Sequence, residues 1–249
     1  MKFGIHNPSW VLGPEPAEAF EAVKAKAQWA ENHGFVWFSV MDHLIQIAGV
    51  GAPEEPFLEG WTVLSALAAV TSRIRQMEEA VRLILAMWTE KRTTFQGRYF
   101  HVEDAILEPK PVQKPRPPVM IAGGGEQLTL RAVARLADAC NVGGEPDMVR
   151  HKLSVLRAHC DAAGRDYNAI EKTHNNSWLI ARDEPEVAAK RERLTARGPL
   201  RGFVGTVSQA IDLIGQYRDA GVQLLINSDY RNDVETHELM AAEVMPHFA

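Results

Sequence analysis

The chain has 249 residues, of which 46% are hydrophobic and 24% are charged, and its formal net charge is −5. This length and composition are typical of a globular protein with one large domain or two small ones. The sequence has no basic run, so it gives no support to a nucleic-acid-binding or acidic-lipid-binding protein.

The N-terminus, MKFGIHNPSW, has no apolar signal core. No segment contains the ~18 uncharged apolar residues that a membrane span needs. Cys140 and Cys160 do not have the spacing of a CxxC or zinc motif. We therefore expect a cytoplasmic protein with reduced, packed thiols, without a metal site and without a nucleic-acid or membrane partner.

The first part of the chain predicts strands that alternate with helices. Residues 35–41, FVWFSVM, are aromatic and β-branched, which is typical of a strand, and Gly34 is suited to end the helix before it. The expected elements are a strand at 2–6, a helix ending at Gly34, a strand at 35–41, a loop at 44–60, helices at 61–70 and 76–88, and a polar, proline-rich connection at 89–116.

The stretch from Pro117 to Gly144 has the clearest pattern. An apolar run at 119–122 predicts a buried strand, and the glycines 123–125 follow it directly. Apolar residues at helical spacing come next, and 138–141 predicts a second strand that ends in Gly143 and Gly144. The stretch is therefore expected to form a strand, a glycine turn, a helix, a strand and a second glycine turn.

These glycine turns are candidate anion sites. Glycine lets backbone N–H groups approach an anion closely, and the dipole of a following helix adds partial positive charge. A phosphate fits such a turn, although the same glycines could serve only to make tight turns. The dinucleotide spacing GxGxxG is absent, so a Rossmann fingerprint is not indicated.

The remaining third of the chain continues the alternation. Thr206 and Gln209 have the spacing of a capping box, which predicts a helix start. His174-Asn175-Asn176 is assigned to a loop and His237 to a solvated position. The expected elements are helices at 147–163, 185–197, 206–221 and up to Met245, and strands around 177–180 and at 222–226. The alternation implies a mainly parallel sheet.

An ordered series of motifs resembles the luciferase-like monooxygenase superfamily, the bacterial flavin- and deazaflavin-dependent TIM barrels. The resemblance implies one α/β domain of the TIM (β/α)8-barrel type over residues 1–249, and a homodimer. The motifs are AQWAENHGF, a strand ending in MDH, WTVLSALAAVTSRIR, QMEEAVRLILAMW, FQGRYFHVEDAILEPKPVQKPRPPVMIAGGG, LRAVARLADACN and FVGTVSQAIDLIGQYRDAGVQLLI.

One departure from the family lies at Arg75, which is followed directly by Gln76. In the family, two strand–helix units stand between these motifs, about 60 residues if a ~250-residue barrel is divided by eight. Only six strands are expected, starting near 2, 36, 118, 138, 176 and 222. We therefore expect an incomplete barrel that lacks the family's strands 3 and 4. The chain could be a deleted or engineered form, a natural shortened relative, or a sequence from which a segment is omitted.

The resemblance also implies the site residues. Asp42 and His43 follow the second strand, and DH at this position is typical of the deazaflavin-using branch, so both are expected to be catalytic. A surface histidine at the start of a loop is the alternative reading of His43. Residues expected to bind the cofactor are Asn7, His43, Gly123, Gly124, Gly125, Asn141, Gly143 and Gly144.

The function that the resemblance implies is an oxidoreductase. Its cofactor is expected to be coenzyme F420, a deazaflavin, with FMN as the alternative. The expected reaction is hydride transfer or oxygen insertion on an unknown small organic substrate. The competing hypothesis is a non-catalytic remnant, because a chain that lacks strands 3 and 4 would lose part of the ring pocket.

Overall fold

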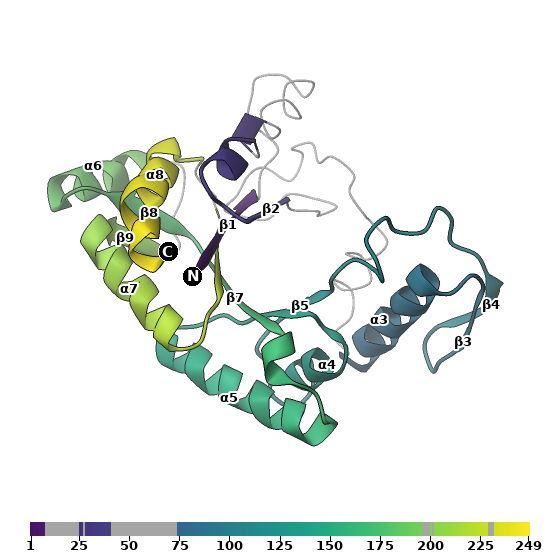
Figure 1. Ribbon diagram of the computed structural model, residues 1–249. Helices are drawn as coiled ribbons and strands as arrows, with labels where there is room; N and C mark the ends of the chain where they lie inside the picture. The colour runs from purple at the N-terminus through teal and green to yellow at the C-terminus, as the bar shows by residue number, and fades with distance from the viewer. Residues whose placement is uncertain (8–24, 27, 41–73, 196–199, 201, 229–231) are drawn as a thin grey trace. The chain divides into compact units, whose positions relative to one another are not determined.

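The computed structural model describes residues 1–7, 25–26, 28–40, 74–195, 200, 202–228 and 232–249 (Figure 1). The chain divides into two compact units. Unit one consists of Met1–Thr62, Gly143–Arg150 and Thr173–Ala249, and unit two consists of Val63–Val142 and His151–Lys172. The expectation of one domain over residues 1–249 stays a prediction.

Unit one is built on parallel strands in the order β2-β1-β10-β7. The strands are β1 (Lys2–Asn7), β2 (Trp37–Val40), β7 (Glu171–Asn176) and β10 (Leu224–Ser228), and β7 belongs to this unit from Thr173 onward. Ile5 and all five residues of β10 are buried. Strands of a parallel sheet are covered on both faces, which explains the apolar run in β10.

A second, smaller parallel pair in unit one is formed by β8 (Trp178–Ala181) and β9 (Phe203–Thr206). The helices α6 (Glu184–Thr195), α7 (Val207–Asp219) and α8 (Val234–Leu239) pack around this pair (Figure 1). The capping box is confirmed, because the Gln209 N–H donates to the Thr206 hydroxyl over 3.3 Å and the Thr206 N–H donates to Gln209 Oε1 over 2.9 Å.

The strand around 177–180 was expected in the main sheet, and that expectation is wrong. The preceding segment, EKTHNN, forms β7 of the main sheet, and the chain then passes at Ser177 into the small pair. Accordingly, His174-Asn175-Asn176 lies in a strand and not in a loop. The polar sequence of β7 concealed it, since Thr173 and His174 are buried although neither is apolar.

The end of the chain closes unit one. After α8 come a π-helical turn at Met240–Val244 and a 3-10 turn at Met245–Phe248. The Met1 ammonium donates to the Phe248 carbonyl oxygen over 2.6 Å, so the two termini lie side by side (Figure 1). His237 was expected to be solvated, but it is 4% exposed and its ring lies 6.0 Å from that of Trp29.

Unit two contains the parallel pair β5 (Met120–Ala122) and β6 (Ala139–Asn141) with the helices α3 (Ile74–Thr89) and α4 (Thr129–Leu136). The connection expected at 89–116 contains an antiparallel hairpin of β3 (Thr93–Gln96) and β4 (His101–Ala105). The Glu79 carboxylate of α3 accepts hydrogen bonds from the N–H groups of Arg98 and Tyr99 between these strands. This contact ties the hairpin to α3.

Two further features of the chain bear on the expected barrel. Helix α3 runs without interruption through Arg75 and Gln76, where the family motifs are joined. Parallel strands begin at residues 2, 37, 120, 139 and 224, close to five of the six expected starts, whereas β7 begins at residue 171 in place of the strand expected near 176. The loss of the family's strands 3 and 4 stays a prediction.

Helix α5 (Pro146–Ala163) follows the second glycine turn and begins at a proline, as first helical turns often do. Cys140 and Cys160 are both buried free thiols, as expected. Burial raises the pKa of the Cys160 thiol. Such a thiol stays protonated at neutral pH, which suits packing better than nucleophilic chemistry.

Candidate functional site

The C-terminal ends of the parallel strands in unit one carry polar side chains. In the register of the sheet, His6 of β1 pairs with Ser228 of β10, and Asn227 of β10 pairs with Asn176 of β7. Carboxyl ends of parallel strands meet at one edge of a sheet, and this is where α/β proteins build their binding sites. We therefore take this edge as the candidate active site.

One side-chain pair connects two strands at this edge. The Ser228 hydroxyl donates to Asn175 Oδ1 over 2.8 Å. Ser228 is 2% exposed, whereas Asn175 is exposed. Asn175 pairs in register with Ile226, so Ser228, two residues further along β10, reaches it on the same face of the sheet. The buried Ser228 hydroxyl thus holds the exposed Asn175 side chain in place.

The neighbouring asparagines at the same edge have structural partners. Asn227 Oδ1 accepts a hydrogen bond from the Trp178 N–H over 3.1 Å, and Asn176 Oδ1 accepts one from the Ser177 N–H over 2.9 Å. Both bonds hold the backbone where the chain leaves β7 for β8. Sequence reasoning missed the β7 side of this edge, because it placed the segment of β7 in a loop. The run of polar residues ahead of WLIA was the signal for it.

The expected catalytic residues follow the neighbouring strand. Strand β2 ends at Val40, and Asp42 and His43 lie outside the described residues. Asn7 ends β1 and pairs with Val40 through the backbone, while its side chain lies outside the description. The roles expected for Asp42, His43 and Asn7 therefore stay predictions.

The first glycine turn lies in unit two, between β5 and α4. Gly123 has φ +125°, and its N–H donates to the Asn141 carbonyl oxygen over 2.9 Å. Within the described part of the chain, the N–H groups of Gly124 and Gly125 donate to no acceptor. Two backbone donors are therefore free to meet an anion.

At this turn Gly123, and not Gly124, adopts a left-handed backbone. A Cβ atom on Gly124 would lie 3.5 Å from Lys152 Cε, which is an ordinary contact. A glycine at 123 is required by the backbone conformation. At 124 the backbone conformation and the surrounding space are compatible with a side chain.

Charged side chains from α5 lie beside this turn. Lys152 Nζ donates to Glu126 Oε1 over 2.5 Å, and His151 Nε2 lies 3.1 Å from the same oxygen. The hydrogen bonds from Lys152 and then from His151 lower the pKa of the Glu126 carboxyl. No sequence pattern pointed to Lys152, which is brought to the turn by the packing of α5 within unit two.

The second glycine turn, Gly143-Gly144, lies in unit one ahead of α5. Gly144 has φ +116°, and a Cβ atom there would lie 2.7 Å from Met148 Cγ. Its carbonyl oxygen accepts a hydrogen bond from the Tyr217 hydroxyl over 3.1 Å. Burial raises the pKa of Tyr217 to about 12, so the phenol stays protonated and fixes the turn at neutral pH.

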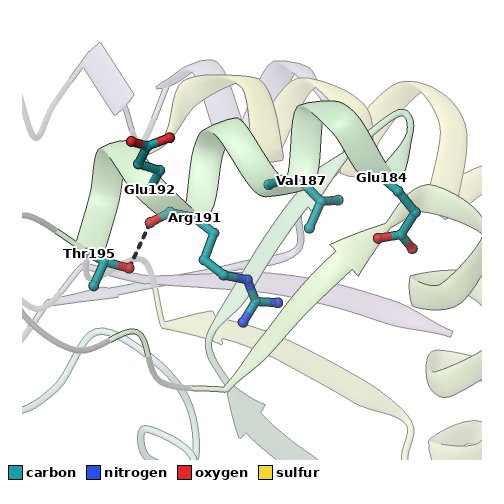
Figure 2. A pocket seen from close by; sticks show the side chains of 6 residues that line it. Glu184, Val187, Arg191, Glu192 and Thr195 are labelled. Atoms are coloured by element: carbon teal, nitrogen blue, oxygen red, sulfur yellow. Dashed lines mark hydrogen bonds between the residues drawn. The ribbon is translucent and has the colours of Figure 1, made fainter.

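A surface pocket lies along α6 and is lined by none of the glycine-turn or strand-end residues described above. Figure 2 shows its lining side chains, which all come from one helix. The Thr195 hydroxyl there donates to the Arg191 carbonyl oxygen over 2.6 Å. Among the described residues, no group of three or more His, Cys, Asp or Glu is placed to hold a metal ion. The same residues include no helix that is long and apolar enough to cross a membrane.

Comparison with known sequences gives a consistent picture. The sequence profile of the luciferase-like monooxygenases matches residues 73–242. An F420-dependent glucose-6-phosphate dehydrogenase of Kineococcus radiotolerans is 33% identical over 130 residues, which are 51% of this chain and 37% of that protein. An FMNH2-dependent dimethylsulfone monooxygenase of Pseudomonas putida is 30% identical over 117 residues, 47% of this chain and 31% of that protein. The chain thus spans well under half the length of both relatives.

A solved structure shares the fold. The coenzyme F420 dependent tetrahydromethanopterin reductase of Methanopyrus kandleri superposes with a TM-score of 0.74, covering 100% of this chain and 99% of that one at 14% sequence identity. At this identity the likeness concerns the fold alone. The structural relatives are TIM-barrel enzymes of the luciferase-like type, which agrees with the α/β class that was expected.

Proposed function

We propose, from the premise that the chain belongs to the luciferase-like monooxygenase family, that it is an oxidoreductase acting on a small organic substrate with F420 or FMN. The single observation that carries the proposal is the family match over residues 73–242. The polar edge of unit one supports it, because the family's fold places chemistry at the carboxyl ends of its strands.

The cofactor would supply the redox reactivity, by carrying a hydride in the case of F420 or by reacting with oxygen in the case of reduced FMN. We favour F420 because of Asp42-His43 at the end of the second strand. Relatives of both cofactor types match this chain, so the sequence comparisons support either choice.

The glycine turns fit the phosphate that both cofactors carry. Gly124 and Gly125 offer free N–H donors, and the Lys152 ammonium, which is paired with the Glu126 carboxylate, lies beside them. Gly143-Gly144 precedes α5, whose N-terminus favours negative charge. We propose that the first turn, together with Asn141 at the end of β6, contacts the phosphate end of the cofactor. Gly143 and Gly144 are proposed as cofactor-binding residues of unit one in their own right.

His43, with Asp42 beside it in sequence, is proposed as the residue that exchanges a proton with the cofactor–substrate pair. Histidine titrates near neutral pH, which suits this role. Asn7 at the end of β1 would face the same opening and contact the cofactor. These assignments rest on the position of the residues just after β1 and β2.

Titration of the purified protein with FMN and with F420, followed by fluorescence, tests the proposal. We expect saturable binding, with the tighter complex formed by F420; tighter binding of FMN would reverse the preference. Absence of binding to both cofactors in a folded sample would refute the proposal. That result would select the second candidate, a remnant scaffold without a ring pocket, which the directly joined motifs at Arg75 and Gln76 favour.

We also propose that the barrel is shortened and that the protein is a cytoplasmic homodimer. Parallel strands whose edges are left open pair readily with another chain, and a shortened barrel would have such edges. An intact mass of the natural protein would show whether further segments belong to it. Sedimentation at several concentrations measures the assembly, and a concentration-independent monomer would contradict the dimer.

A further inference from the structure

We infer that Asn175 donates a hydrogen bond from its side-chain amide to a carbonyl-type oxygen in the active site, and that Ser228 positions it. The inference rests on the proposed function, since it takes the edge of unit one as the active site. It concerns residues that the family resemblance did not single out.

The first support is that the asparagines at this edge have different hydrogen-bond partners. Asn176 and Asn227 use their side-chain oxygens to hold the backbone N–H groups of Ser177 and Trp178. These two bonds are needed where the chain changes sheets. Asn175 makes no such bond to the backbone, and it is the exposed member of the group. The Asn227 amide nitrogen also has no partner, but it is buried, so Asn175 is the member whose amide can reach a ligand from solvent.

The second support is the direction of the bond to Ser228. The Ser228 hydroxyl donates to Asn175 Oδ1 over 2.8 Å, and thus occupies the acceptor end of the amide. The amide's two N–H donors have no partner among the described residues. Ser228 is 2% exposed, whereas Asn175 is exposed, so a buried hydroxyl holds an amide that is accessible to solvent.

This geometry selects a chemical class of ligand. A neutral N–H donor prefers an oxygen acceptor, such as a carbonyl, and lacks the charge that would hold a phosphate tightly. Two sources could supply the oxygen: a ring carbonyl of the cofactor, or an oxygen of the small organic substrate. His6 pairs with Ser228 in the adjacent strand, so the donor stands within a polar neighbourhood that can accommodate such a ligand.

The test uses the side-chain amide signal of Asn175 in 15N-labelled protein, assigned by comparison with Asn175→Asp. In one arm FMN or F420 is added; in the other, acetone or dimethyl sulfone is added to the protein–cofactor complex. We expect a downfield shift of the amide protons, in the first arm if the cofactor supplies the oxygen and in the second if a substrate-like oxygen does. Fluorescence titration of the same samples records whether the cofactor is bound.

Variants provide an independent readout. Asn175→Asp should raise the dissociation constant of the complex that shifts the signal by about 10-fold, because the substitution replaces the amide donors by a carboxylate of the same shape. Ser228→Ala should weaken it by about 3-fold and broaden the Asn175 amide signal, which a merely structural change would not do. Asn168→Asp, the same substitution on an exposed turn of unit two, is the control and should leave binding unchanged.

The outcomes separate the two proposals. A bound cofactor without any shift in either arm, and with unchanged affinity in Asn175→Asp, overturns the inference while the proposed function stands. Failure of the parent protein to bind either cofactor overturns the proposed function, and the inference with it.

Discussion

Replacement of Gly124 by valine is the most direct test of the anion-binding turn. The position does not require a left-handed backbone, and a Cβ atom there would make an ordinary 3.5 Å contact with Lys152 Cε. The substitution is therefore expected to leave the fold intact. Its side chain would, however, occupy space beside the free N–H groups of Gly124 and Gly125, which a phosphate must approach closely.

The expected magnitude follows from the hydrogen bonds that are lost. A hydrogen bond to a charged group contributes about 1.5–3 kcal/mol, so losing one of the two donors should raise the dissociation constant for the cofactor by roughly 10- to 100-fold. The free energy of unfolding should change by less than ~1 kcal/mol, as is usual for an unstrained surface position.

Two other glycines provide matched controls. Gly123→Val should lower the free energy of unfolding by about 1–3 kcal/mol, because Gly123 has φ +125° and its N–H is already bonded to Asn141. Gly215→Val tests a glycine at which a Cβ atom would meet nothing within 4 Å, and it should leave cofactor binding unchanged.

The assay is fluorescence titration with FMN and with F420, beside urea denaturation of each variant. Inorganic phosphate, added as a competitor, reports on the anion site alone. If folded Gly124→Val binds cofactor and phosphate as tightly as the parent protein, the glycines at this turn serve only to make the turn, and the reasoning is refuted.

Three further predictions concern the proposed catalytic residue and the buried ion pair of unit one. His43→Ala should retain cofactor binding but lose turnover, and an active variant would show that His43 is a surface residue. Lys190 is 4% exposed, and its Nζ lies 2.6 Å from Asp233 Oδ2. Replacement of Lys190 by methionine should lower the free energy of unfolding by about 3 kcal/mol, because the buried Asp233 carboxylate then loses its main partner. A urea midpoint equal to the parent's would contradict this. Burial alone would raise the pKa of Asp233, but hydrogen bonds from Lys190 and Thr236 outweigh it and hold the pKa below its usual value. The pair's stabilisation should therefore be complete above about pH 5 and should be lost as the pH falls through the lowered pKa. Between about pH 5 and pH 2 the urea midpoint should fall more steeply for the parent than for Asp233→Asn. Equal slopes for the two proteins would contradict this.

Local pattern was sufficient for much of this chain. The apolar runs that form β1, β5, β6 and β10 are visible in the sequence, since buried parallel strands must be apolar on both faces. The capping box at Thr206 and the helix end at Gly34, which has φ +81°, are likewise encoded by a few adjacent residues. The order of motifs indicated the luciferase-like family, which the sequence comparison confirms.

Other features depend on contacts between segments far apart in the chain. Strand β7 is polar in sequence, yet it pairs with β10 and its residues Thr173 and His174 are buried. Lys152 reaches the first glycine turn because α5 packs beside it, and it is 26 residues from its partner Glu126. The Ser228–Asn175 bond likewise joins residues 53 positions apart. The periodicity of a sequence indicates which face of a segment is buried. Strand order and helix packing decide which other segments that face contacts. The sequence by itself therefore determined most of the elements and the glycine turns, whereas the tertiary structure decided β7 and the β3–β4 hairpin and which side chains meet at the candidate site.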